Sequence, residues 1–220
     1  MPNDIETINT GLNNVPVCTS AISATTADRE KNPLLMYRGY SIYELVKAPF
    51  EEVAYLILNG KLPNKNEFET FDSELKKNRT ICDEVVNHIK TYPRDVNRMD
   101  FLFTVLSYAR MFEDDYRNPL WCSAKADPKV LAEHIKNVGI KIGAKIPTII
   151  AYGHRILNGM EPIPPDSKLS HAANFLYMLG LNATDEQVKA LDVSLTLYLD
   201  HTLNNSTFIA SEGEITMSHL

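Results

Sequence analysis

Hydrophobic residues recur every three or four positions through most of the chain, and this spacing predicts helices joined by short loops. We predict helices at 50–59, 81–89, 99–112 and 169–179, and a long one from 127 towards 159. Three further helices are predicted to start near residue 41, after residue 64 and after residue 184. Pro147 lies inside the longest of these segments, and a proline removes one backbone hydrogen bond of a helix. We therefore expect a kink or a break there.

Polar residues with capping chemistry stand at the predicted helix starts. In a capping box, Ser, Asn or Thr and a Glu or Gln three residues later each bond the other residue's backbone amide. Three such pairs occur: Ser41 with Glu44, Asn64 with Glu67, and Thr184 with Gln187. Pro49 and the Asp127-Pro128 pair indicate further starts, and Gly60 and Gly180 indicate ends.

The segment after residue 187 fits two patterns. Apolar residues alternate strictly from 191 to 199, which is typical of a strand. Val188, Leu191, Leu195 and Tyr198 also form a helical stripe, and a capping box lies just upstream. We favour the helix.

The first forty residues follow a different pattern. Val15, Val17 and Ile22 stand among Thr and Ser residues, residues 28–33 have turn composition, and an apolar run resumes at 34–37. This pattern predicts a small β-hairpin. The chain then divides into an N-terminal arm and hairpin at 1–40, a helical part at 41–210 and an atypical tail at 211–220. The expected fold class is mainly α.

Composition and charge are those of an ordinary globular protein, with 44% hydrophobic and 23% charged residues and a net charge of −6 over 220 residues. No run of Lys and Arg stands out, so we expect no nucleic-acid partner. The longest apolar stretches, at 54–58 and 146–152, are too short to cross a bilayer. The polar start lacks the apolar part of a secretory signal, which predicts a cytoplasmic protein, or an organellar one after import.

The cysteines and histidines give no metal pattern. Cys18, Cys82 and Cys122 are widely spaced, no CxxC pair occurs, and no two histidines have the spacing of a metal site. We therefore expect free thiols, no metal and no cofactor. His88 and His134 stand in polar helical segments and are expected at the surface.

A third histidine stands in an apolar segment. His171 and Asn174 are three residues apart and so share one helix face. We interpret this segment as a capped, packed helix with a hydrogen-bonded core histidine.

A dense polar group follows the last apolar run. Its members are Asp200, His201, Asn204, Asn205, Ser206 and Thr207. Such a group at the end of a buried element suits a small anionic ligand, to which a protonated His201 would donate a hydrogen bond. The alternative is a plain helix C-terminus and loop, where a histidine is favourable at the negative end of the helix dipole. The residues alone leave both interpretations open.

Four segments resemble the citrate synthase family. They are YRGYSI at 37–42, FEEVAYL at 50–56 with GKLP at 60–63, LSHAANFLYML at 169–179, and LYLDHTLNNSTF at 197–208. They occur in the family's order and spacing, and the resemblance covers residues 11 to 210. Each segment is weakly specific, but four in order make chance similarity improbable.

The resemblance implies a mainly α homodimer whose subunits have a large and a small domain. Such enzymes join acetyl-CoA, or propionyl-CoA, to oxaloacetate and give citrate, or methylcitrate, and free CoA, without a metal. His201 matches a histidine that holds oxaloacetate, and Asn204 falls on the asparagine of the same signature.

The sequence also departs from the family. Tyr198 stands where many members have a histidine, Thr202 replaces a glutamate, and Asn205 replaces an alanine. After Ala210 the family continues into a GPLHGGAN-type loop, a second histidine-bearing loop and a catalytic aspartate, whereas this sequence ends at Leu220. We therefore expect an incomplete large domain that lacks the catalytic residues and is inactive alone. The alternatives are a non-catalytic helical protein that pairs with a full-length homologue, and an unrelated helical scaffold.

Overall fold

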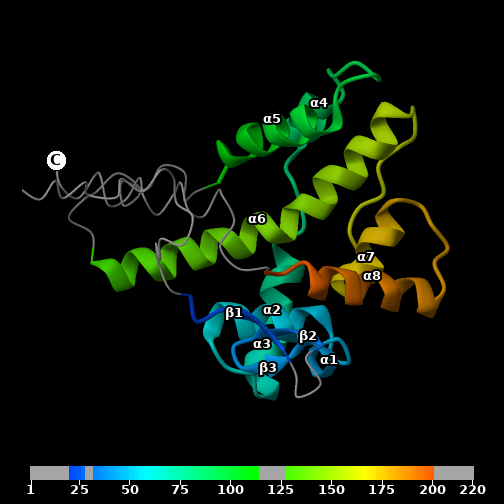
Figure 1. Cartoon of the computed structure of the whole chain (residues 1–220). Coiled ribbons are helices and arrows are strands. Elements are labelled where there is room, and N and C mark those ends of the chain that lie inside the picture. The colour runs from blue at the N-terminus through cyan, green and yellow to red at the C-terminus, as the bar shows by residue number, and fades with distance from the viewer. Residues whose placement is uncertain (1–19, 28–31, 114–126, 201–220) are drawn as a thin grey trace, which may run out of the picture.

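The structure, a computed structural model, describes residues 20–27, 32–113 and 127–200. Within these ranges the chain is mostly helical with a small antiparallel sheet, which confirms the expected fold class (Figure 1). The elements are β1 (Ser23–Ala27), β2 (Pro33–Tyr37), β3 (Tyr40–Ser41), α1 (Ile42–Leu45), α2 (Phe50–Asn59), α3 (Lys65–Lys77), α4 (Asp83–Ile89), α5 (Arg98–Arg110), α6 (Pro128–Leu157), α7 (His171–Met178) and α8 (Asp185–Leu197).

The N-terminal sheet confirms the predicted hairpin and adds a third strand. β1 pairs with β2 in the register Ser23 to Tyr37, and β2 pairs with β3 in the register Tyr37 to Tyr40. The hairpin's first strand lies after Ile22, later than expected, and Val15 and Val17 lie outside the described residues. The turn between β2 and β3 consists of Arg38 and Gly39, whose φ angles of 48° and 89° are the left-handed values that a tight hairpin turn requires.

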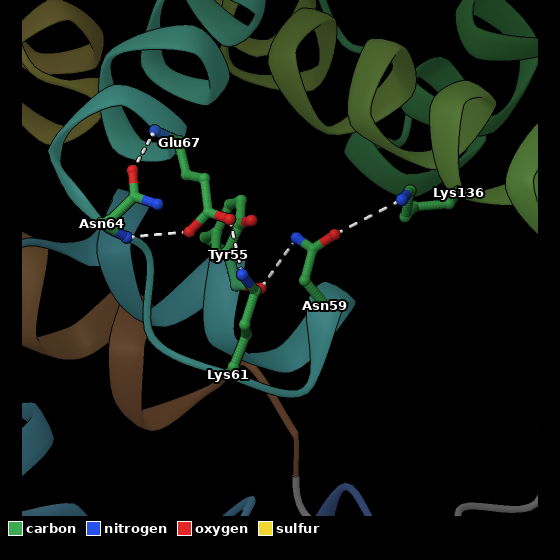
Figure 2. Close-up of polar contacts among 6 residues, drawn as sticks. All are labelled: Tyr55, Asn59, Lys61, Asn64, Glu67 and Lys136. Carbon is green, nitrogen blue, oxygen red and sulfur yellow. Dashed lines mark hydrogen bonds and ion pairs between the residues drawn. The ribbon is translucent and has the colours of Figure 1, made fainter.

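The α2 helix and its neighbours confirm the predictions from capping residues. α2 runs over Phe50–Asn59, and Gly60 ends it with a φ of 77°. The capping box at the start of α3 is present: Asn64 Oδ1 accepts from the Glu67 amide at 3.0 Å, and Glu67 Oε2 accepts from the Asn64 amide at 2.9 Å. Figure 2 shows this box beside the end of α2, where Lys136 of α6 donates to Asn59 at 3.3 Å.

Two predicted starts need correction. Ser41 caps α1, but its hydroxyl accepts from the Tyr43 amide and the reciprocal bond of a box with Glu44 is not formed. α7 starts at His171 and not at residue 169, because the Ser170 hydroxyl accepts from the Ala173 amide and makes Ser170 the cap. The box of Thr184 with Gln187 is confirmed.

The longest helix, α6, passes through Pro147 without a break. It curves gently across the molecule in Figure 1, with α4 and α5 on one side and α3 on the other. Buried residues on both sides of the proline hold the two halves in one helix: Ala144 clusters with Phe71 and Leu75 of α3, and Ile149 clusters with residues of α4 and α5. Tertiary packing thus offsets the loss of one backbone hydrogen bond, and of the two expected outcomes, a kink or a break, the break was wrong.

The largest apolar cluster lies where α4, α5 and α6 meet. Its buried members are Ile81, Val85, Ile89, Phe101, Val105, Ala109, Ile149, Tyr152 and Leu157. Phe101 packs deeply in this cluster because it faces Gly153 of α6. A glycine at this contact lets the two helices approach closely.

The α8 segment is a helix, as favoured, and Val188, Leu191 and Leu195 of its predicted stripe are partly buried. Asp192 and Thr196 are its buried residues, whereas Tyr198 is 86% exposed. Asp192 is buried because its carboxylate serves a neighbouring helix, as described below. None of the described helices is long and apolar enough to cross a membrane.

The close contact at Gly153 gives a testable prediction. A Cβ atom there would lie 2.4 Å from Phe101 Cζ, so we expect Gly153→Ala to lower the free energy of unfolding by about 1–3 kcal/mol. Gly143→Ala is the matched control, because it is on the same helix and nothing lies within 4 Å of its added Cβ. That change should raise the free energy of unfolding by roughly 0.5–1 kcal/mol. Urea denaturation measures both, and equal effects of the two substitutions would contradict the prediction.

Candidate functional site

The predicted binding residues His201 and Asn204 lie outside the described residues, so their roles stay predictions. The chain that leads to them is described as far as Asp200, which follows the end of α8. The candidate site is therefore built from the end of α8 and from the elements that hold it.

Tyr37 of β2 holds the end of α8. Its side chain is fully buried, and its hydroxyl lies 2.9 Å from the carbonyl oxygen of Asp200 and 3.1 Å from that of Leu197. The same hydroxyl accepts from the Asp200 amide at 3.4 Å. Burial raises the pKa of Tyr37 above its ordinary value, so the hydroxyl remains a donor at neutral pH. The last carbonyls of a helix lack hydrogen-bond partners within the helix, and the Tyr37 hydroxyl is such a partner for α8.

Ser23 of β1 makes a further contact in the same place. Its hydroxyl donates to the carboxylate of Asp200. Ser23 and Tyr37 are partners in the sheet register, which explains why both hydroxyls reach one residue. The residue immediately before His201 is thus held by both its backbone and its side chain.

A buried carboxylate ties α8 to the start of α2. Asp192 is 7% exposed, and its Oδ1 accepts from the Phe50 amide at 3.1 Å. Pro49 stands at the cap position of α2 and provides no side-chain cap, so Asp192 takes that place. Lys189 donates to the other carboxylate oxygen at 3.2 Å.

A second buried carboxylate ties α2 to α7. Glu51 is 2% exposed, and its Oε1 accepts from the His171 amide at 2.6 Å. This amide belongs to the first residue of α7, where a negative charge is also favoured by the helix dipole. The carboxylates of α8 and α2 therefore fix the starts of α2 and α7 in turn.

Arg79 completes the buried polar network. Its side chain is 1% exposed, and Nη1 donates to the carbonyl oxygens of Leu169 at 2.9 Å and Asp166 at 3.1 Å. Thr148 of α6 donates to the Arg79 carbonyl oxygen at 2.7 Å. Burial lowers the pKa of Arg79, and the negative charge of Glu51 opposes that shift. Arg79 thereby fixes the loop that leads into α7.

His171 is buried in a capped, packed helix, as interpreted from the sequence, but it is not hydrogen-bonded as a core histidine should be. Its Nδ1 has no hydrogen-bond partner among the described residues, and its ring lies 5.2 Å from that of Phe50. Burial, reinforced by the positive charge of Arg79, lowers the pKa of His171 to about 4. The imidazole is therefore neutral at physiological pH. Its neighbour on the same face, Asn174, accepts from the Asp166 amide at 2.8 Å.

His88 and His134 are not surface residues, contrary to expectation. Both are partly buried. The His88 ring stacks on Tyr108 at a centroid distance of 4.0 Å, and its Nε2 lies 3.1 Å from the Tyr92 hydroxyl. Tyr92, four residues along the chain, and Tyr108 of α5 hold this histidine inward, and the contact with Tyr108 depends on how α4 and α5 pack. In the described part of the chain, no cluster of His, Cys, Asp and Glu has the arrangement of a metal site.

Comparison with known proteins identifies relatives over nearly the whole chain. The family profile described as "Citrate synthase, C-terminal domain" matches residues 11–216. A citrate synthase from Synechocystis sp. is 38% identical over 225 aligned positions, which cover 99% of this chain and 52% of that protein. A 2-methylcitrate synthase 1 from Corynebacterium glutamicum is 32% identical, with 91% of this chain and 51% of that protein covered.

The structural comparison agrees. The crystal structure of citrate synthase from Pyrobaculum aerophilum superposes with a TM-score of 0.81 at 32% sequence identity, covering 90% of this chain and 48% of that one. The chain therefore spans about half the length of the relatives it matches.

The depressed pKa of His171 predicts a pH-dependent stability. Between its folded pKa of about 4 and its ordinary value of 6.5, the unfolded chain binds the proton more readily. His171 thus contributes stability that is complete above pH 6.5 and is lost as the pH falls towards 4, by about 3 kcal/mol at the limit. We expect the free energy of unfolding to fall less steeply between pH 6.5 and 4.5 in His171→Gln than in the wild type. Urea titrations at several pH values measure this slope of unfolding free energy against pH. His154→Gln, at an exposed position, is the control and should keep the wild-type slope. A wild-type slope in His171→Gln would refute the prediction.

Proposed function

Because the chain belongs to the citrate synthase family, we propose that it forms part of an acyltransferase that condenses acetyl-CoA with oxaloacetate to give citrate and CoA. The observation that carries the proposal is the fixed position of Asp200, which Tyr37 and Ser23 hold directly before His201. The first residues of the matched signature, from Leu197 to Asp200, are thus held to the N-terminal sheet. Propionyl-CoA is the alternative acyl donor, since one relative is a 2-methylcitrate synthase.

In this proposal His201 and Asn204 hold oxaloacetate. A protonated imidazole donates to a carboxylate or to the keto oxygen, and the amide of Asn204 adds a neutral donor. Polarising the keto group favours attack by the carbon of the enolised thioester, which forms once a base removes a proton from its methyl group. Water then cleaves the thioester and releases CoA. The reaction requires no metal or other cofactor, and a cytoplasmic location suits its substrates.

We further propose that these 220 residues alone do not catalyse the condensation. The reaction needs a base and a donor to the enol oxygen in addition to the oxaloacetate-binding group. The buried histidine of the described region does not suit either role, because His171 is 7% exposed and its neighbouring Glu51 is occupied as a helix cap. By the family resemblance, an aspartate and a histidine that follow the matched segments perform these steps.

We also propose that the protein acts as a homodimer that pairs through α5 and α6. Both helices expose large apolar side chains, with Met99 71% and Phe103 75% exposed. Between them lies a mainly apolar groove of about 250 Å³, lined by Leu106, Val138 and Ile142 among others. Exposed apolar surface of this kind marks an interface. The second candidate, a non-catalytic partner of a full-length homologue, would use the same face.

Oxaloacetate binding tests the proposed site. We expect the 220-residue chain to bind oxaloacetate in calorimetry and His201→Gln to weaken binding by about tenfold or more, because one charge-assisted hydrogen bond is lost. His154→Gln, at an exposed histidine of α6, is the control and should bind like the wild type. Equal affinity in His201→Gln would refute the assigned role. CoA release above background from acetyl-CoA and oxaloacetate would refute the proposed inactivity of the chain alone.

Light scattering after size-exclusion chromatography tests the dimer. A buried carboxylate in an apolar interface is costly, so Phe103→Glu should convert the dimer into a monomer at micromolar concentration. Tyr43→Glu is the control, since Tyr43 is also well exposed, at 63%, but lies on α1. A monomeric wild type would refute the homodimer. Association of that monomer with a full-length homologue would then favour the non-catalytic candidate.

A further inference from the structure

We propose that a cleft beside α3 and α6 binds a small organic amine, with the carboxylate of Glu74 as the partner of its ammonium group. The cleft has a volume of about 320 Å³, and residues of α2, α3 and α6 line it. The inference is independent of the proposed reaction, because it uses no residue to which that reaction assigns a role.

Part of the cleft is apolar and aromatic. Phe71 of α3 and Ile140 of α6 line it, and both are buried members of the apolar cluster that joins these two helices. Tyr55 of α2 also lines the cleft, and its ring meets that of Phe71 edge to face at a centroid distance of 5.5 Å. An alkyl chain gains free energy against such a surface, and an ammonium ion is attracted to the face of an aromatic ring.

The rest of the lining is polar and comes from one face of each helix. A spacing of three or four residues brings side chains onto the same helix face. On α3 the polar lining includes Glu67, Thr70 and Glu74, and on α6 it includes Glu133, Lys136 and Asn137. Three of these side chains are carboxylates and one is an ammonium group, so the pairing of these charges decides which ligand the cleft accepts.

Two of the three carboxylates already have cationic partners. Lys61 donates to Glu67 at 2.5 Å, and Lys136 donates to Glu133 at 2.8 Å. Lys136 is held further by the side chain of Asn59 at 3.3 Å. Figure 2 shows Lys61 against Glu67 and Lys136 against Asn59. These two pairs therefore contribute no net charge to the cleft.

Glu74 is the carboxylate whose charge is left over. Within the described ranges of the chain its side chain is half-buried and forms no ion pair, while its backbone carbonyl accepts from the Asn78 amide group at 2.9 Å. The side chain of Asn137 likewise makes no hydrogen bond to the described residues and can accept through its oxygen. One unbalanced carboxylate, a neutral acceptor and an apolar surface are complementary to an ammonium group on a short apolar chain.

Three ligands of similar size and different charge test this complementarity. Hexylamine, which is protonated at neutral pH, is titrated into the 15N-labelled 220-residue chain beside hexanol and hexanoate. We expect hexylamine to shift the resonances of Thr70 and Asn137, hexanol to bind about tenfold more weakly, and hexanoate not to bind. Hexanol or hexanoate binding as tightly as hexylamine would overturn the proposal, as would no binding of hexylamine at millimolar concentration.

Glu74→Gln keeps the size of the side chain and removes its charge. We expect it to weaken hexylamine binding about tenfold or more and to leave hexanol binding unchanged, because only the amine uses the charge. Glu69→Gln is the matched control, since Glu69 is an exposed carboxylate of the same helix outside the lining of the cleft. Wild-type affinity in Glu74→Gln, or an equal loss in Glu69→Gln, would overturn the assignment.

A second variant changes the charge in the opposite direction. Lys136→Gln removes the ammonium group of the cleft and leaves Glu133 without its partner, so hexylamine should bind about threefold tighter or more. Lys129→Gln, at an exposed position at the start of α6, is the control for net charge and should bind like the wild type. Unchanged or weaker binding in Lys136→Gln would contradict the proposal. Should Glu74→Gln fail to fold, Lys136→Gln and the three ligands decide.

Discussion

The fold depends on two buried carboxylates that each accept the first amide of a helix in another part of the chain. Asp192 of α8 caps Phe50, and Glu51 of α2 caps His171 of α7. A buried amide without a partner costs free energy comparable to a lost hydrogen bond, and a charged acceptor roughly doubles the gain. Each cap also forms only when the carboxylate and the helix start are correctly placed relative to each other. The relative placement of three helices is therefore set by polar contacts, around which the apolar clusters pack.

A buried charge needs compensation, and Arg79 provides it at this centre. It lies close enough to Glu51 for their charges to interact, and it also holds the loop before α7. Buried opposite charges add little net stability, but they penalise every arrangement that separates them. Thr148 extends the same network to α6, the longest helix. This network favours one register of helices over alternatives that would bury similar apolar area.

Sequence patterns predicted those features of the fold that depend on residues close together in the chain. Helical periodicity and capping boxes located most helices, and Gly60 correctly ended α2. The misses are residues whose role depends on a distant partner. Asp192 stands between apolar residues, and no local pattern indicates that it caps α2. Tyr37 ends an apolar run, and no local pattern indicates that its hydroxyl bonds the end of α8. The roles of His201 and Asn204 remain predictions of the family resemblance, because they lie beyond the described residues.

The bond between Tyr37 and the Leu197 carbonyl joins residues 160 positions apart, and this separation has a consequence for synthesis. At about 5–20 residues per second, a ribosome makes Tyr37 roughly 8 to 30 seconds before its partner. During that interval the sheet and α2 exist without the helix end that covers them. The first and last described segments must therefore close together as a late event in folding. Tyr37, which is fully buried in the folded protein, therefore stays without its α8 partners until residue 200 has left the ribosome.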